Sequence, residues 1–196
     1  MTLARMAFGD ASLTRQALLV LAATAFIAIA AQISVPMFPV PMTLQTLAIL
    51  VVGLSFGARM GAVTVLAYLA EGALGLPVFA NAGNGAAFFG PTAGFLVGFV
   101  ALAWIAGFAA DRGLTRTVFG AALTCIVASA VLYIPGVAWP MAVASAFGLD
   151  AGWVGLPVDV IWKSFMAPFL IGDVVKSVIA ALVVTGALHA LKRRSA

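Results

Sequence analysis

Charge is scarce in this sequence. Only 8% of its 196 residues are Asp, Glu, Lys or Arg, while 64% are hydrophobic, whereas soluble domains usually carry about 25% charged residues. So little charge excludes a protein whose only solvent is water. The net charge of +4 is small and lies mostly at the chain ends and in short loops. This excludes the broad basic face that nucleic-acid binding requires.

Cysteine and histidine are nearly absent. The sequence has one cysteine, Cys125, inside an apolar run, and one histidine, His189. A disulfide framework within the chain is therefore excluded. The sequence also contains no paired-histidine or Cys-x-x-Cys metal motif and no phosphate-binding loop. We therefore expect no metal and no cofactor, and we expect any ATP to be bound by other chains.

Long apolar runs are the main feature that is present. A membrane-spanning helix needs about 20 predominantly apolar residues. The runs predict an all-α integral membrane protein, with residues 1–196 as a single polytopic domain. The first run has no clear cleavage site and is interpreted as a retained span rather than a signal peptide. The six predicted spans are approximately 16–35, 44–56, 60–76, 92–110, 117–137 and 167–191.

Loop charges support the count of six and predict the orientation. Cytoplasmic loops of membrane proteins are enriched in Lys and Arg. With the N-terminus inside, Lys163 is the only basic residue in the outer loops, and Lys176 lies within the last span. Omitting the short second span would move Arg112 and Arg116 outside. We therefore predict six spans with both termini cytoplasmic and these basic residues inside: Arg5, Arg15, Arg59, Arg112, Arg116, Lys192, Arg193 and Arg194.

The predicted outer loops are chemically varied, whereas the inner loops are short. Pro36–Thr43 contains three prolines and cannot form regular helix. Gly75–Thr92 is rich in glycine and asparagine, and Trp139–Ser164 is rich in tryptophan. This asymmetry predicts a site that opens toward the outside.

Asp173 and Lys176 form a charge pair inside the last apolar run. Their i, i+3 spacing places them on one helix face, and a charge at mid-bilayer costs at least ~2.5 kcal/mol. Such groups usually face a cavity or a partner, so we interpret the pair as ligand-binding. The alternative is that Asp173 is the N-cap of a shorter helix and that Lys176 extends toward the surface.

Four more polar residues are candidates for the same cavity. Tyr68 and Glu71 lie three residues apart near the outer end of the third span, where anchoring at the membrane surface is the alternative. Asn81 and Asn84 lie in the glycine-rich loop. Their amides suit a polar ring on a ligand, and turn formation is their alternative role.

The sequence contains three long motifs, "QISVPMFPVPMTLQTLAILVVGLSFGARMGAVTVLAYLAEGALGLPVF", "GPTAGFLVGF" and "PFLIGDVVKSVIAAL". They resemble the BioY family, the biotin-binding S components of energy-coupling factor (ECF) vitamin transporters, and the resemblance extends from about Gln32 to Leu182. It implies a six-helix protein of the prokaryotic plasma membrane that binds biotin in an outward-facing pocket under the first loop. It also implies an energy module, consisting of a transmembrane T component and two ABC-type ATPases.

The resemblance also assigns roles to individual residues. Asp173 and Lys176 resemble the ligand-contacting pair of the family, and the family's asparagine corresponds to Asn81, with Asn84 as the alternative. Tyr68 and Gln45 resemble pocket or lid residues. Docking on the T component is implied for small residues of the first helix, where Thr24 and Ala28 are the closest match. The aromatic side chains expected to pack on the apolar ring of biotin are Phe38, Phe79 and Phe88.

From these observations we predict a substrate-binding membrane subunit for biotin uptake that performs no chemistry on its ligand. The proline-rich first loop is expected to close as a lid after capture, and a partner complex is expected to power transport. Whether the chain also forms a homo-oligomer is left open. Two alternatives remain at this point. One is an ion-coupled transporter with Asp173 as the ion site, and the other is an intramembrane enzyme that uses Asp173 or Glu71.

Overall fold

A computed structural model describes residues 12–194 of the chain. Arg5, which we placed on the inner side, lies outside the described residues. Within them the fold is all-α with six main helices, as predicted. These helices are α2 (Leu13–Gln32), α3 (Gln45–Phe56), α4 (Ala58–Ala73), α5 (Ala93–Asp111), α6 (Val118–Ala138) and α9 (Ala167–Arg194).

The segments between the main helices contain short elements. The proline-rich loop becomes a hairpin, because β1 (Ser34–Val35) pairs antiparallel with β2 (Met42–Thr43). The next outer loop forms two 3-10 turns, η1 (Ala80–Ala82) and η2 (Gly85–Phe89). The third contains the π-helical turn η3 (Trp139–Val143), α7 (Ala144–Ala146), α8 (Val158–Ile161) and a second π-helical turn, η4 (Trp162–Met166).

Helix α9 begins at Ala167, where we predicted the last span to begin, but helical structure continues upstream of it. Elements α8, η4 and α9 follow one another directly, so the helical segment starts at Val158 rather than near Ala167. Pro168 lacks an N–H, and its ring would collide with the carbonyl of Ser164 in a regular α-helix. Ser164 lies in the wider π-helical turn, which relieves that collision. The proline therefore does not end the helix.

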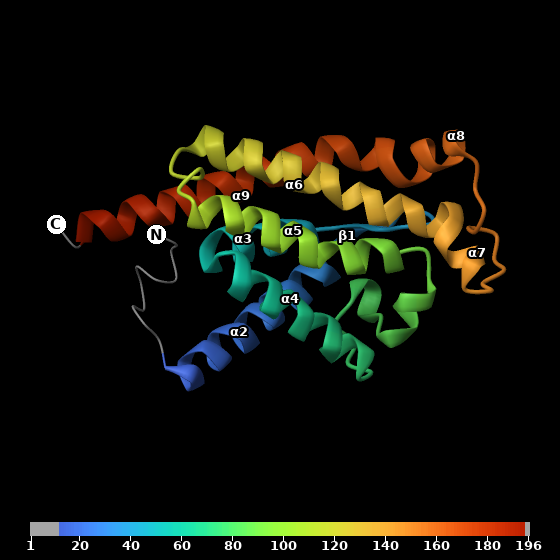
Figure 1. Ribbon diagram of the computed structural model, residues 1–196, viewed down its shortest axis with the longest axis horizontal. Helices are drawn as coiled ribbons and strands as arrows, with labels where there is room; N and C mark the ends of the chain where they lie inside the picture. The colour runs from blue at the N-terminus through green and yellow to red at the C-terminus, as the bar shows by residue number, and fades with distance from the viewer. Residues whose placement is uncertain (1–11, 195–196) are drawn as a thin grey trace.

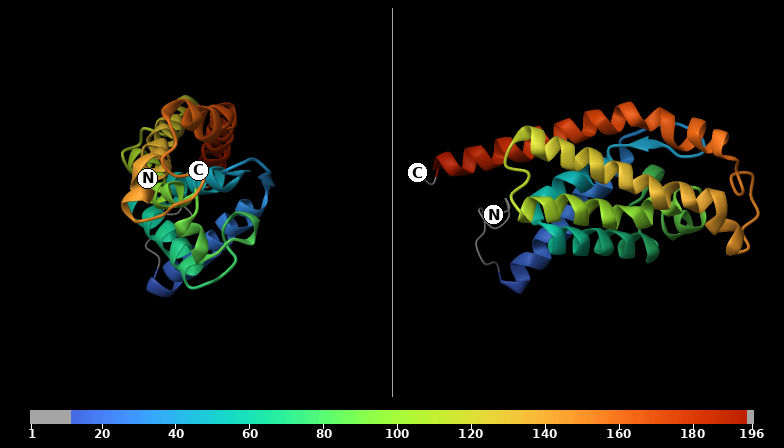
Figure 2. Two further views of the ribbon diagram at one scale, coloured as in Figure 1. Left: turned by 90° about the vertical axis from the view of Figure 1, so that its right-hand side faces the viewer. Right: turned by 45° about the horizontal axis from the view of Figure 1, so that its top comes forward.

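Helix α5 lies at the centre of the bundle. It packs against α3, α4 and α6, and α9 packs along α3 and α6 (Figure 1). Helix α2 crosses the edge of the bundle obliquely and contacts α3 and α4, as the two views in Figure 2 also show. Four helical segments are long and apolar enough to cross a membrane, and α3 is a shorter apolar helix. The short second span therefore exists as a helix within the bundle.

Glycines allow the central helices to approach closely. A Cβ added at Gly53 of α3 would lie 2.6 Å from the carbonyl oxygen of Ala103 in α5. A Cβ at Gly94 of α5 would collide with the carbonyl oxygen of Pro135 in α6. Small residues at such contacts let helix backbones meet directly. These contacts fix the helices whose outer ends surround the candidate site.

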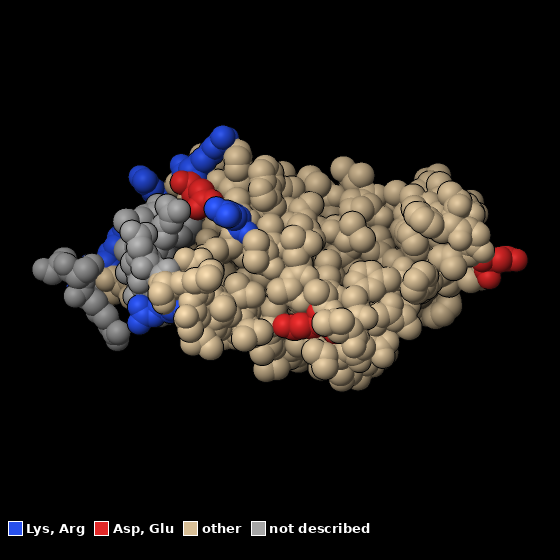
Figure 3. Space-filling view, turned by 60° about the horizontal axis from the view of Figure 1, so that its bottom comes forward, with Lys and Arg blue, Asp and Glu red and all other residues tan. Residues whose placement is uncertain are grey.

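Lys and Arg side chains gather at one end of the molecule, and most of the face shown in Figure 3 is uncharged. That end contains the start of α2 and the end of α9 (Figure 1). It also contains the short turns between α3 and α4 and between α5 and α6, with Arg59 and Arg116. At this end the carboxylate of Asp111 accepts a 2.9 Å hydrogen bond from the backbone N–H of Ala58, which caps α4.

Candidate ligand-binding site

A cavity of about 180 Å³ lies among the ends of the helices opposite the basic end. Its wall combines the start of α3, the outer half of α5, the outer part of α6 and the first half of α9. The hairpin residues 40–43 and the loop residues 79–81 complete it. The cavity therefore lies on the side that loop charge predicts to be external.

Asp173 and Lys176 both line this cavity from α9. The ammonium Nζ of Lys176 lies 3.2 Å from Oδ1 of Asp173, and the two side chains are 8% and 15% exposed. Asp173 lies well inside the continuous helix, so our alternative of an N-cap at the start of a shorter helix is wrong. The pair thus faces the cavity and does not lie at a helix end.

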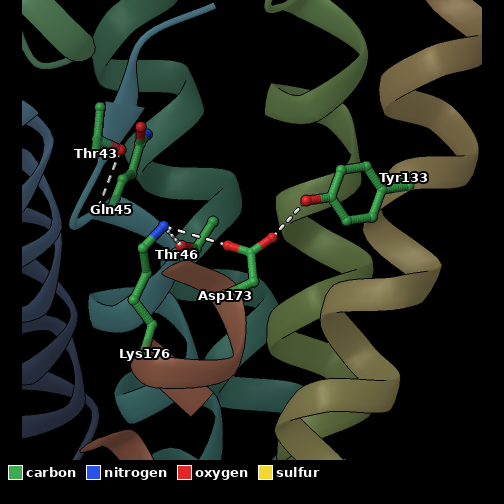
Figure 4. Close-up of polar contacts among 6 residues, drawn as sticks. All are labelled: Thr43, Gln45, Thr46, Tyr133, Asp173 and Lys176. Atoms are coloured by element: carbon green, nitrogen blue, oxygen red, sulfur yellow. Dashed lines mark hydrogen bonds and ion pairs between the residues drawn. The ribbon is translucent and has the colours of Figure 1, made fainter. Parts of the chain in front are cut away.

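Tyr133 and Thr46 complete the polar contacts of the pair (Figure 4). The hydroxyl of Tyr133 on α6 donates a 2.5 Å hydrogen bond to Oδ2 of Asp173. Lys176 Nζ donates to the hydroxyl of Thr46 on α3 at 3.2 Å. Both residues line the cavity, and our sequence reasoning missed both. The available signal was weak, since each is a single hydroxyl within an apolar segment far from Asp173 in sequence.

Gln45 is the first residue of α3 and lies in the cavity wall. Its Nε2 donates to the hydroxyl of Tyr68 at 2.8 Å, and that hydroxyl donates to the carbonyl of Val78 at 2.8 Å. Tyr68 is fully buried and lies behind the wall rather than in it. The tyrosine therefore orients Gln45 and ties α4 to the following loop.

The structure separates the two asparagines. Asn81 lies in the cavity wall, and its Oδ1 accepts a 3.2 Å hydrogen bond from the hydroxyl of Ser34 in the hairpin. Asn84 caps the η2 turn by accepting from the backbone N–H of Ala86 at 3.2 Å. Of the two, Asn81 is the residue placed to contact a ligand.

The three phenylalanines also have different positions. Phe79 lines the cavity and is 2% exposed. Phe88 packs edge-on against Phe79, with ring centroids 5.5 Å apart, and supports it from outside the wall. Phe38 lies in the hairpin loop and is 90% exposed. Further apolar wall comes from Phe95, Leu96, Phe99, Leu132 and Phe169.

Glu71 lies away from the cavity. Its Oε1 accepts a 2.7 Å hydrogen bond from the hydroxyl of Thr24, which joins α4 to α2. Glu71 and Tyr68 are on the same helix but have different partners. Thr24 is itself 2% exposed, so its side chain faces α4 and is not presented on the outer surface of α2.

The wall of the cavity combines polar and apolar side chains. Its polar groups include the carboxylate of Asp173, the ammonium of Lys176 and the side-chain amides of Gln45 and Asn81. Within residues 12–194, no group of three His, Cys, Asp or Glu side chains could hold a metal ion. The arrangement suits a small organic ligand with a polar hydrogen-bonding head and an apolar body.

Comparisons with known proteins agree on one family. A sequence model described as "BioY family" matches residues 3–193. "Biotin transporter BioY" of Rhizobium etli is 37% identical over 158 residues, which cover 76% of this chain and 79% of that protein. "Probable biotin transporter BioY" of Pyrococcus horikoshii is 33% identical, over 81% of this chain and 87% of that protein.

A solved structure has the same fold. The crystal structure described as the S-component for biotin from an ECF-type ABC transporter superposes on this chain with a TM-score of 0.71. The superposition covers 89% of this chain and 93% of the chain in that crystal structure. The two sequences are 24% identical. The arrangement of helices described above is therefore that of this solved membrane protein.

Proposed function

This chain belongs to the BioY family, and on that premise we propose that it is the substrate-binding membrane subunit, or S component, for biotin uptake. It captures biotin from outside in the cavity between the hairpin and helices α3, α5, α6 and α9. Its location is the plasma membrane of a prokaryote, which it crosses several times. The family consists of transporters, so the intramembrane-enzyme alternative has no support.

The observation that carries this proposal is the buried ion pair in the cavity wall. Biotin has a ureido ring with two N–H donors and one carbonyl, an apolar sulfur-containing ring and a carboxylate tail. An ionised carboxylate has about four lone-pair sites. Asp173 can therefore accept from a ureido N–H while it keeps the hydrogen bonds from Lys176 and Tyr133. The phenylalanines of the cavity wall suit the apolar ring.

The same contacts argue against an ion-coupled carrier. Each carboxylate oxygen of Asp173 already accepts from a protein donor, and one of these donors is the cationic Lys176. A second cation would have to approach an ammonium group 3.2 Å from the carboxylate. Like charges this close repel strongly in a weakly polar environment. A neutral donor such as a ureido N–H meets no such repulsion.

The proposed transport cycle depends on partners. The described residues form a cavity on one side of the helix bundle, and the sequence contains no nucleotide-binding motif. We propose that a T component and two ABC-type ATPases supply the energy for release to the cytoplasm. Thr24 faces α4, so the T component would contact other small residues of α2.

The experiment that tests this function is a biotin titration of the purified chain without ATP. We expect binding in the nanomolar to micromolar range. Asp173→Asn and Lys176→Ala should each weaken binding at least tenfold, because a site built on buried polar groups loses affinity when one of them is left unpaired.

A second ion pair provides matched controls. Lys163 and Asp159 lie 3.7 Å apart in the outer part of the last helix but are 74% and 67% exposed. Asp159→Asn and Lys163→Ala should leave biotin affinity within twofold of the original. Unchanged affinity in both Asp173→Asn and Lys176→Ala would remove the pair from the binding site, and absence of biotin binding by the unmodified chain would refute the function itself.

A further inference from the structure

Gln32 ends helix α2 and holds the loop that follows α4. Its Nε2 donates to the carbonyl of Phe79 at 3.0 Å and to the carbonyl of Ala28 at 3.1 Å. Its Oε1 accepts from the backbone N–H of Ala82 at 2.9 Å. One side-chain amide therefore binds the loop 79–83 at two points, Phe79 and Ala82, and fixes it to the end of α2.

The loop held in this way has an unfavourable backbone. Asn81 and Ala82 have φ values of 56° and 57°, in the left-handed region that is strained for residues with a Cβ, more so for alanine than for asparagine. The loop also forms two backbone hydrogen bonds of its own, from the N–H of Phe79 to the carbonyl of Gly83 at 2.9 Å and from the N–H of Gly83 to the carbonyl of Ala80 at 3.1 Å. Residues in such conformations persist only when their surroundings fix them. Gln32 supplies two of the fixing contacts, and it supplies them on both flanks of Asn81.

The position of this loop matters for the cavity, because Phe79, Ala80 and Asn81 all line it. Asn81 is also linked to the chain just after α2, through the hydroxyl of Ser34. The end of α2 and the start of the hairpin therefore reach the cavity wall through the same three-residue segment. Helix α2 otherwise lies at the edge of the bundle, and most of its surface is exposed.

We propose that Gln32 is a positioning residue for ligand capture. Its amide holds residues 79–83 so that Asn81 stays in the cavity wall, and this couples the position of the outer end of α2 to ligand affinity. The proposal rests on the proposed function, since biotin is the ligand whose affinity reports the coupling. By reciprocity, a ligand bound at Asn81 favours the position of α2 that keeps these hydrogen bonds.

A double-mutant cycle on the full chain tests this role. The variants are Gln32→Met, which keeps the length of the side chain but removes both of its hydrogen bonds to the loop, Asn81→Ala, and the two combined. Gln32→Met should weaken biotin binding three- to tenfold. In the Asn81→Ala background the same change should cost less than twofold, because the group that Gln32 positions is already gone.

Hydrogen exchange gives a readout that does not depend on biotin. In the ligand-free chain, the amides of residues 79–83 should exchange at least threefold faster in Gln32→Met, while peptides from α5 remain unchanged. Gln32→Glu keeps the acceptor for Ala82 but loses the donor to Phe79. If Gln32→Met does not fold, Gln32→Glu replaces it in both experiments, with the same expected changes in biotin affinity and in hydrogen exchange.

Thr24→Val is the matched control, because Thr24 also joins α2 to another part of the fold, through its hydrogen bond to Glu71 of α4. It should leave biotin affinity within twofold. The inference is overturned if Gln32→Met binds biotin within twofold of the original chain. It is also overturned if Gln32→Met weakens binding by the same factor in the Asn81→Ala background as in the original chain, or if Thr24→Val weakens binding as much as Gln32→Met does. Failure of the unmodified chain to bind biotin refutes the proposed function, and exchange at residues 79–83 then decides alone whether Gln32 holds the loop.

Discussion

At the scale of single residues, the site depends on how the charges of Asp173 and Lys176 are satisfied. A buried charge is costly unless it is paired and hydrogen-bonded. Asp173 has a donor on each oxygen, and Lys176 has two acceptors, Asp173 and Thr46. These partners come from α3 and α6 as well as α9. The pair is therefore held in a fixed geometry before any ligand arrives.

Tyr133→Phe tests this preorganisation. The change removes only the hydroxyl that donates to Asp173 Oδ2. The carboxylate then loses an orienting contact, and we expect biotin binding to weaken three- to tenfold by titration calorimetry. Thr124→Val, also on α6, removes a hydroxyl that donates to the backbone carbonyl of Gly120 in its own helix, and it should leave affinity unchanged. Equal affinities for Tyr133→Phe and the original chain would show that the tyrosine hydroxyl is dispensable.

Some of these residues are predictable from sequence and others are not. Asp173 and Lys176 stand out because charge is costly in an apolar run. Tyr133 and Thr46 do not, because a hydroxyl is tolerated in such runs and their partner lies on another helix. Glu71 has the same rarity as Asp173 but meets Thr24 on α2 instead of the cavity. Rarity identifies a residue that needs a partner, and only the packing shows which partner it has.

At the scale of elements, the hairpin is the part of the cavity wall with the least helical support. It is attached through Val40, which is 7% exposed and packs in a cluster with Tyr133, Ile161, Phe165 and Phe169. Phe165 lies in the π-helical turn η4, and Phe169 lies just beyond it. The π-helical turn η4 and its neighbours in the last helical segment, together with Tyr133 of α6, thus form the surface against which the hairpin packs.

Val40→Ala should loosen this attachment. Losing two buried methyl groups removes about 1–2 kcal/mol of apolar contact, so we expect biotin to dissociate roughly three- to tenfold faster in a chase experiment. Phe38→Ala is the matched control in the same loop, because Phe38 is 90% exposed and should have no effect on the dissociation rate. If both variants release biotin at the original rate, the hairpin is a connector and not a lid.

Prediction of the elements succeeded where length and periodic hydrophobicity decide, and it failed where tertiary packing decides. The starts of α3 and α5 agree with the sequence to within a residue or two. The start of α9 agrees as well, but the helical turns upstream of it were not predicted, because prolines usually mark a boundary and here a π-helical turn accommodates Pro168. The hairpin was predicted only as non-helical, because its pairing joins residues on either side of three prolines.

At the scale of the whole molecule, the charges divide the two ends. Arg15, Arg59, Arg112 and Arg116 lie at the end that contains the short turns. The cavity and the hairpin lie at the other end. The positive-inside rule therefore places the basic end in the cytoplasm and the cavity toward the exterior.

Cysteine labelling in intact cells tests this orientation. The native thiol of Cys125 is buried, and a Cys125→Ala background removes it from the labelling experiment. In it, Asp150→Cys in the loop at the cavity end should react with a membrane-impermeant maleimide. Arg116→Cys, in the turn at the basic end, should react only after the cells are permeabilised. Labelling of Arg116→Cys in sealed cells would invert the topology and place the cavity inside.

The location of the ion pair on α9 has a consequence for biosynthesis. The ribosome makes α9 after α3 and α6, so its two charged groups enter the bilayer after the helices that shield them. Until α3 and α6 dock against α9, the translocon meets a segment whose insertion is penalised by at least ~2.5 kcal/mol for each exposed charge. Substitutions that loosen the seam between α6 and α9 should therefore appear first as low yield and quality-control degradation, before any defect in a mature transporter can be measured.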